Sequence, residues 1–227
     1  MTDLDLQITL PIIPRFHISR ILPFCGILAP PVIIIIVLVA GMLTPGYNQF
    51  TDTISSLSAQ GSQNPNLMIA GFIIYGVLII GFAYALFLRL RHGTKARIAW
   101  FTLTLYGVCM ILAGVFQNNT GANITVLNME GILHNAAVIT SCLSVLTGMC
   151  MFAGSVYKKP SWYGFTWFTI GASLLGLILS IIFLIQSQVP FSGLFQRIFY
   201  LIILIWIEIV SVWLFRLSIN YQTRQLS

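Results

Sequence analysis

Charged side chains are scarce in this chain. Its 227 residues include 11 Lys and Arg and 5 Asp and Glu, so 7% are charged, whereas 58% are hydrophobic. A water-soluble domain usually has about 25% charged residues, so this composition excludes a protein whose surface lies mainly in water. Together with a mean hydropathy of +0.94, it predicts an integral membrane protein.

Cysteine and histidine are also few, and their positions exclude several chemistries. No disulfide framework is predicted, because all four cysteines lie inside apolar segments without a CxxC pair: Cys25, Cys109, Cys142 and Cys150. The three histidines do not share one end of the apolar segments, so no metal site is predicted, and no other cofactor either. The GxSxG, HExxH and P-loop motifs are absent from the sequence.

Long apolar runs are what the chain has in abundance. A helix that crosses the hydrocarbon core needs about 20 apolar residues, and six runs qualify: Ile21–Leu43, Asn66–Leu88, Ile98–Phe116, Gly131–Ser155, Trp162–Ile185 and Leu194–Phe215. Backbone polar groups cannot stay unpaired in lipid, and runs this long without alternation do not fit a β-barrel. The predicted fold is therefore all-α, with one six-helix transmembrane domain (21–216) between an N-terminal segment (1–20) and a C-terminal tail (217–227).

The basic residues predict the direction of these helices. Ten of the eleven lie before the first run, after the last run, or in the second and fourth connections, and Arg197 is the exception. Positively charged loops stay in the cytoplasm, so we predict a multi-pass protein of the plasma (inner) membrane with both termini cytoplasmic. This clustering beside apolar runs is typical of membrane topology, so the net charge of +6 does not indicate nucleic-acid binding.

The first outward connection, Asn48–Pro65, is polar. Apolar side chains recur in and just before it at helical spacing, which predicts a short amphipathic helix at the outer interface: Tyr47, Phe50, Ile54 and Leu57. The opposite side of that helix would carry Asp52, Ser55, Ser56 and Ala59. These polar side chains could line an outward cavity. Alternatively, Asp52 simply occupies the first helical turn, where the helix dipole favours a carboxylate.

Ionisable residues near the outer ends of the runs are candidate binding residues, because such residues are costly within a membrane. His134 and Glu130 lie about one turn apart at the start of the fourth run, and Arg197 lies about one turn into the sixth. The predicted binding cluster consists of Asp52, Ser55, Ser56, Asn118, Glu130, His134 and Arg197. Such a cluster could hold an anionic head group or support acid–base chemistry. Alternatively, Arg197 extends to the interface in an ordinary ion pair.

Glu208 is predicted to form a secondary polar site. It lies eleven residues after Arg197, roughly 16 Å along a helix, which places it in the inner half of the bundle. A carboxyl group there could relay protons, couple transport, or only hydrogen-bond a neighbouring helix.

Several short segments, in this order and spacing, resemble a family of bacterial and archaeal membrane proteins, the domain of unknown function 998 family. They are "TPGYNQFTDTISSLSAQG", "NPNLMIAGFIIYGVL", "LAGVFQNN", "GILHNAAV" and "GLFQRIFYLIILIW". The resemblance covers about Ile21 to Phe215. It implies six helices and recurrent polar positions at Asp52, Ser55, His134 and Arg197, whereas the family's acidic residue after the third span is replaced here by "QNN". It implies no activity, since the family has none assigned.

Three functions follow from these residues. The leading hypothesis is a membrane protein that binds, or binds and transports, a lipid head group or small solute in an outward-facing polar pocket. The second is an intramembrane lipid hydrolase with His134 as base and Ser55 or Ser56 as nucleophile. The third is a structural or accessory subunit that contacts another membrane protein. The expected partners are membrane lipid and such a ligand, without nucleic acid; the oligomeric state is left open.

Overall fold

The computed structural model describes residues 15–90, 93–118, 128–185 and 191–223. Within these ranges the chain forms α1 (Arg15–Met42), η1 (Ile54–Ser58), α2 (Pro65–Leu90), α3 (Thr94–Val115), α4 (Met129–Val156), η2 (Pro160–Trp162), α5 (Tyr163–Ile185) and α6 (Ser192–Thr223). The two η elements are short 3-10 helices. Six helices of the described ranges are long and apolar enough to cross a membrane. The predicted all-α, six-helix membrane architecture is therefore confirmed.

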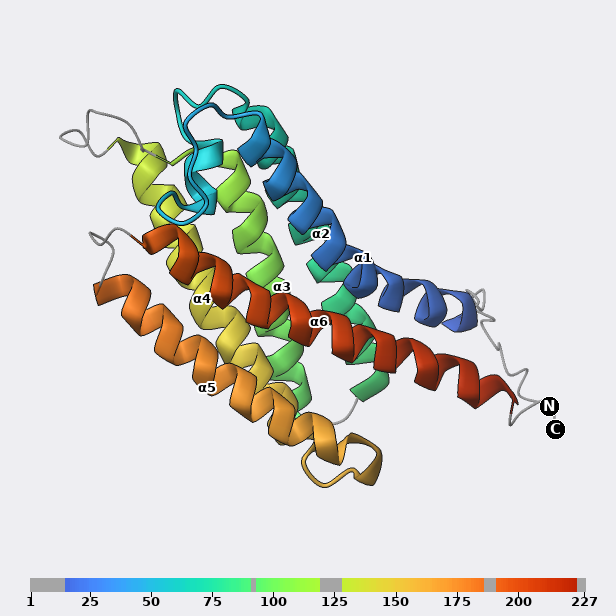
Figure 1. The fold of residues 1–227 in the computed structure, drawn as a ribbon. Helices are drawn as coiled ribbons and strands as arrows, with labels where there is room; N and C mark the ends of the chain where they lie inside the picture. Colours follow the sequence, from blue (N-terminus) through green and yellow to red (C-terminus); the bar gives the residue numbers. More distant parts are fainter. Residues whose placement is uncertain (1–14, 91–92, 119–127, 186–190, 224–227) are drawn as a thin grey trace, which may run out of the picture.

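The helices pack in chain order, and α6 closes the bundle by packing against both α5 and α1 (Figure 1). The start of α1, the end of α6 and the α4–α5 connection lie at one end of the bundle, which we call the terminal end (Figure 1). η1 packs against α1, α2 and α6 at the other end, which we call the η1 end. That the terminal end faces the cytoplasm stays a prediction.

α1 contains three internal prolines, Pro23, Pro30 and Pro31. Proline lacks a backbone donor and crowds the preceding turn, so it bends a helix. α1 changes direction along its length, and its first turns diverge from the rest of the bundle (Figure 1). The part of α1 that follows the prolines runs alongside α2 to the η1 end, and α6 diverges from it toward that end (Figure 1).

Aromatic side chains fill the centre of the bundle, with Trp206, Tyr75, Tyr106 and Phe152 almost fully buried. Their polar atoms are paired, as burial away from water requires. The Tyr75 and Tyr106 hydroxyls are 2.9 Å apart, and Trp206 Nε1 donates to Thr169 Oγ1 at 2.9 Å. These hydrogen bonds join α2 to α3 and α6 to α5.

Glycine sets the spacing of α2 and α3. A Cβ atom on Gly76 would lie 2.5 Å from the Gly107 carbonyl oxygen, and one on Gly107 would lie 2.7 Å from the Gly76 carbonyl oxygen. The two backbones are thus in direct contact, an approach that small residues allow in lipid.

Candidate functional site

The segment between α1 and α2 is folded into the η1 end of the bundle. Within the described residues 43–64, its helical part is confined to Ile54–Ser58 and is a 3-10 helix. Ile54 and Leu57 are buried, as predicted for one side of an amphipathic helix, but Ser55 and Ser58 are buried as well. The helix η1 covers Ile54–Ser58 and packs against α1, α2 and α6, which accounts for the burial of serines as well as apolar residues. That a helix here lies at the outer interface stays a prediction.

Arg197 joins this segment to the first turns of α6. Its Nη1 donates to the Asp52 carbonyl oxygen at 2.8 Å and to the Gly193 carbonyl oxygen at 3.0 Å, and its Nη2 donates to the Tyr47 hydroxyl. The Asp52 carboxylate accepts hydrogen bonds from Asn48 N (2.8 Å) and Thr51 Oγ1 (3.0 Å) within its own turn. Arg197 and Asp52 thus lie in contact, and the hydrogen bond between them uses the Asp52 backbone.

Further hydrogen bonds hold the same segment against α6. Ile54 N donates to Gln196 Oε1 at 2.6 Å, and Leu194 N donates to the Phe50 carbonyl oxygen at 3.0 Å. Gly193 packs directly on the Asp52 backbone, with no room for a Cβ atom. The position of Arg197 is therefore fixed by contacts along the first turn of α6, from Gly193 to Gln196.

Tyr47 completes the surroundings of Arg197. Its hydroxyl donates to the Thr53 carbonyl oxygen at 3.1 Å, and the Arg197 guanidinium carbon lies 5.6 Å from the centre of its ring. Burial raises the pKa of the Tyr47 phenol, an effect that Arg197 partly offsets. The neutral phenol is thus favoured, so it can both donate to Thr53 and accept from Arg197.

Glu130 and Asn118 belong to a second polar group, over the ends of α3 and α4. Gln60 Nε2 donates to Glu130 Oε2 at 2.7 Å, and Gln60 N donates to the Asn118 carbonyl oxygen at 3.1 Å. Asn118 Nδ2 contacts Ser55 Oγ at 3.4 Å. Ser55 and Asn118 therefore link this group to η1, while Glu130 lies on its exposed side.

His134 is a buried link between α3 and α4. It is 1% exposed, and its Nδ1 lies 3.0 Å from the Ala113 carbonyl oxygen and 2.9 Å from the Phe116 carbonyl oxygen. Both oxygens belong to the last turn of α3, whose carbonyls lack intrahelical donors. The hydrogen bonds therefore require a proton on Nδ1. Nε2 is buried without a hydrogen-bond partner among the described residues.

The hydrogen bonds of the two serines do not support a nucleophile activated by His134. Ser56 Oγ donates to the Thr53 carbonyl oxygen at 2.7 Å, and Ser55 Oγ lies 3.2 Å from Thr53 Oγ1. Within the described part of the chain, none of the hydrogen bonds of Ser55 or Ser56 goes to His134. A serine nucleophile needs its base within hydrogen-bond reach.

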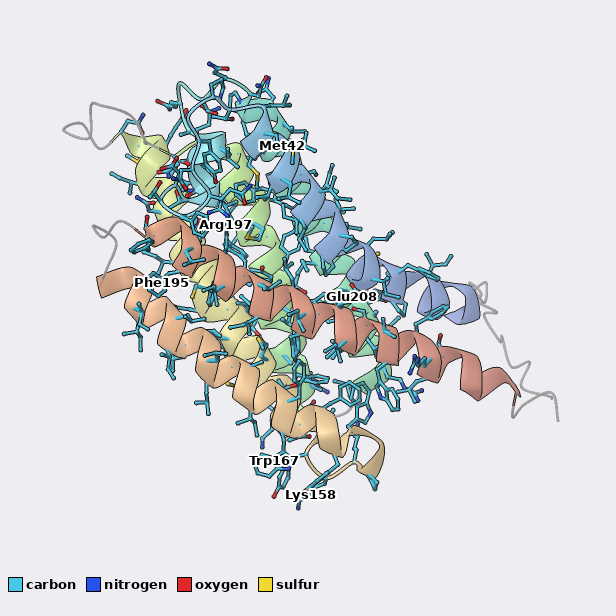
Figure 2. All side chains as sticks on the ribbon, in the orientation of Figure 1. Met42, Lys158, Trp167, Phe195, Arg197 and Glu208 are labelled. Carbon is cyan, nitrogen blue, oxygen red and sulfur yellow. The ribbon has the colours of Figure 1, made fainter. Side chains whose placement is uncertain are left out.

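A cavity of about 220 Å³ lies beside Arg197. Its walls come from α1, α2, α3, α6 and the connection after α1, and its polar lining residues are Gln49, Tyr75, Arg197 and Tyr200. The remaining lining residues are apolar: Ile33, Ile34, Val37, Leu38, Ile54, Phe72, Met110, Leu201 and Leu204. Figure 2 shows Arg197 on the first turns of α6, near η1. The cavity is an apolar pocket with one cationic group.

Comparison with known proteins places the chain in a family. The model of the family described as Protein of unknown function (DUF998) matches residues 27–213. The chain belongs to this family. A search of curated proteins and a search of solved structures each gave no match. The match to the DUF998 family spans all six helices and every residue of the predicted binding cluster, but its description states no activity.

Most of the cavity walls in this DUF998 protein could not be found from sequence. Of the predicted cluster, Arg197 lines the cavity, whereas Asp52 and Ser55 do not, although they belong to the same connection as the lining residues Gln49 and Ile54. Ile33, Val37 and Leu204 are apolar, as are the lipid-facing residues beside them. Residue type alone therefore does not distinguish a cavity-lining position from a lipid-facing one. Only the packing of α1 against α6 distinguishes them.

Glu208 lies apart from this cavity, midway along α6 (Figure 2). Its Oε2 is buried without a hydrogen-bond partner among the described residues, as is Ser211 Oγ one turn further on. Ser211 packs directly against Gly26 of α1. Glu208 is therefore near the contact between α1 and α6. No group of three or more His, Cys, Asp or Glu that could hold a metal ion occurs in the part of the chain that the structure describes.

Proposed function

We propose that this protein binds an anionic amphiphile at the η1 end, with the anionic head group at Arg197 and the apolar part in the cavity between α1 and α6. The observation that carries the proposal is the composition of that cavity, whose lining is mainly apolar and includes one cationic residue, Arg197. Apolar pockets with a few convergent polar groups are the usual form of small-molecule sites.

Arg197 retains capacity for a ligand. A guanidinium group has five N–H donors in a planar fork, which suits carboxylate and phosphate oxygens. The described hydrogen bonds use three of them, to Asp52, Gly193 and Tyr47. Two remain, and the Asp52 carboxylate is engaged within its own turn. The backbone contacts would hold the guanidinium in place before a ligand arrives, which lowers the cost of binding.

The shape of the cavity favours a molecule that is partly in the membrane. At about 220 Å³ it is smaller than the roughly 300–1,000 Å³ of pockets that enclose drug-sized ligands. Three lining residues, Ile34, Leu38 and Leu201, are 39–49% exposed on the outer surface of α1 and α6. An acyl chain could therefore enter from the lipid and place only part of its length in the cavity.

The proposal is tested with single-chain lipids added to the detergent-purified protein. Lysophosphatidylglycerol should raise the unfolding temperature more than lysophosphatidylcholine, because its net charge is negative. Arg197→Gln should weaken lysophosphatidylglycerol binding by about tenfold or more, since a hydrogen bond to a charged group contributes roughly 1.5–3 kcal/mol. Arg216→Gln, which removes an exposed charge from the other end of α6, should bind like wild type.

A second variant keeps the test valid if Arg197→Gln folds poorly. Leu201→Trp places a larger side chain at a half-exposed position of the cavity wall, so it should reduce lysophosphatidylglycerol binding while Arg197 stays in place. Equal binding by wild type, Arg197→Gln and Leu201→Trp would overturn the proposal.

A further inference from the structure

A second and larger cavity lies between α4 and α5, toward the terminal end of the bundle. Its volume is about 750 Å³, and it is lined by α3, α4, α5 and the residues that follow α4. None of its lining residues lines the cavity at Arg197. The two cavities are therefore separate, and an inference about one does not depend on the other.

Small side chains create the hollow between α4 and α5. Ala153, Gly154 and Ser155 on α4 and Ser173 on α5 all line it. Ser155 Oγ donates to the Phe152 carbonyl oxygen, and Ser173 Oγ donates to the Thr169 carbonyl oxygen, each at 2.7 Å. Each serine hydroxyl group thus donates its proton within its own helix, so neither serine needs a hydrogen-bond acceptor on the other helix.

Two lysines lie at the mouth of this cavity. Lys95, in the first turn of α3, reaches across to α4: a Cβ atom on Gly154 would lie 3.0 Å from Lys95 Cδ and 3.4 Å from Lys95 Nζ. Because Gly154 has no side chain, the Lys95 side chain can pack against α4 at this position. Lys158 follows the end of α4 and is exposed. No acidic residue lines the cavity among the described residues, so no carboxylate in its wall neutralises the two lysines.

The mouth lies where lipid head groups are expected. Tyr157, Tyr163 and Trp167 are 53–59% exposed at this end, and Figure 2 shows Trp167 and Lys158 together there. Exposed Trp and Tyr are typical of the boundary between hydrocarbon and head groups. From Lys158 the lining continues along α4 to Leu143, roughly 20 Å of helix, which takes it well into one leaflet of a hydrocarbon core about 30 Å thick.

We propose that this cavity binds one anionic phospholipid. Lys95 and Lys158 contact its phosphate group, and an acyl chain lies along the apolar lining of α4 and α5, which includes Leu143, Leu146 and Leu174. Lysine binds phosphate as a compact point charge, and basic pockets between membrane helices bind anionic head groups. The occupant is a lipid rather than free phosphate, because the apolar part of the cavity is deep and continuous with the membrane.

The test is binding of dioleoylphosphatidylglycerol to the full-length protein, measured by native mass spectrometry and by the shift in unfolding temperature. Wild type should retain one molecule of this lipid at a higher occupancy than dioleoylphosphatidylcholine, and inorganic phosphate should give no shift. The double variant Lys95→Gln/Lys158→Gln should bind it at least tenfold more weakly. Lys159→Gln, which removes a neighbouring exposed charge outside the lining, should match wild type.

A variant inside the cavity distinguishes binding of a phospholipid, acyl chain included, from attraction of any anion to the two lysines. Thr147 is an exposed lining residue about two turns deeper than Gly154, so Thr147→Trp should fill the apolar part and weaken phosphatidylglycerol binding with both lysines present. Arg197→Gln should leave this site unchanged, which distinguishes it from the site at the η1 end. Equal affinity for the two phospholipids, a shift with inorganic phosphate alone, or wild-type binding by the double lysine variant would each overturn the proposal.

Discussion

Arg197 and His134 each use some of their polar atoms for hydrogen bonds that hold the fold together, and each has others that make no hydrogen bond among the described residues. Arg197 donates to the Asp52 and Gly193 carbonyl oxygens, and His134 Nδ1 contacts the last-turn carbonyl oxygens of α3. Carbonyl groups at the C-terminal end of a helix lack intrahelical donors and are costly to leave unpaired away from water, so His134 stabilises the end of α3. Arg197 stabilises the fold by joining the Asp52 backbone to the first turn of α6. Each also keeps unused capacity, two N–H groups on Arg197 and Nε2 on His134.

Replacing His134 should therefore reduce stability. His134→Ala leaves the Ala113 and Phe116 carbonyl oxygens without their side-chain partner, and we expect the free energy of unfolding to fall by about 1–3 kcal/mol. Asn135→Ala, at an exposed position next to it, should change little. The comparison is made by thermal unfolding in detergent. If the two variants unfold at the same temperature, the His134 contacts do not stabilise the junction of α3 and α4.

Tyr47 should make the stability depend on alkaline pH. Burial raises the pKa of its phenol in the folded protein, whereas an unfolded tyrosine titrates near about 10. The folded state thus favours the neutral phenol, so this contribution is complete below about pH 10 and is lost as the pH rises through the folded value. The unfolding temperature of wild type should fall above pH 10 more steeply than that of Tyr47→Phe. Identical slopes would show that Tyr47 does not contribute.

At the scale of elements, the first turns of α6 connect the fold to the proposed site. Leu194, Gln196 and Arg197 all hydrogen-bond the connection between α1 and α2, which includes η1. Gly193 permits this contact, because the Asp52 backbone occupies the space that a Cβ atom would need. The same connection supplies Gln49 and Ile54 to the cavity, so a shift of α6 against it would change the cavity as well.

Gly193→Ala should accordingly destabilise the protein and weaken ligand binding together. The methyl group meets backbone atoms of Asp52, and overpacking of this kind costs about 1–3 kcal/mol. Gly171→Ala is a matched control on α5, since no atom lies within 4 Å of the position of its Cβ, and alanine favours a helix by up to about 1 kcal/mol over glycine. Thermal unfolding and lysophosphatidylglycerol titration give the two readouts. Equal stability of the two variants would contradict the close contact.

At the scale of the whole molecule, the sequence predicted the six helices because each is an apolar run long enough to cross a membrane. It also placed Asp52 and Arg197 at the same end of their spans, where they could converge. It did not predict that the Asp52 backbone makes the contact, because the turn at Asn48–Asp52 depends on hydrogen bonds that no periodicity encodes. The cavity beside Arg197 depends on how α1 and α6 diverge, which apolar residues alone do not specify.

The direction of insertion can be measured independently of any ligand. Most basic residues of the sequence fall in the segments toward the terminal end, so the positive-inside rule predicts that this end faces the cytoplasm. Gln63→Cys, at an exposed position of the η1 end, should react with a membrane-impermeant maleimide in intact cells. Lys159→Cys should react only after the membrane is permeabilised. The native cysteines lie within the membrane-spanning helices and should give little background. The reverse labelling pattern would place the Arg197 cavity on the cytoplasmic side.

The central claim is that Arg197 and the cavity between α1 and α6 bind an anionic amphiphile. The most direct measurement is photolabelling with a lysophosphatidylglycerol that carries a diazirine on its acyl chain, followed by mapping of the labelled peptides. We expect label on the part of α1 that contains Ile33 and Leu38 and on the part of α6 that contains Leu201 and Leu204, with a marked loss in Arg197→Gln. Label spread over the lipid-exposed faces of the other helices, unchanged by Arg197→Gln, would contradict the claim.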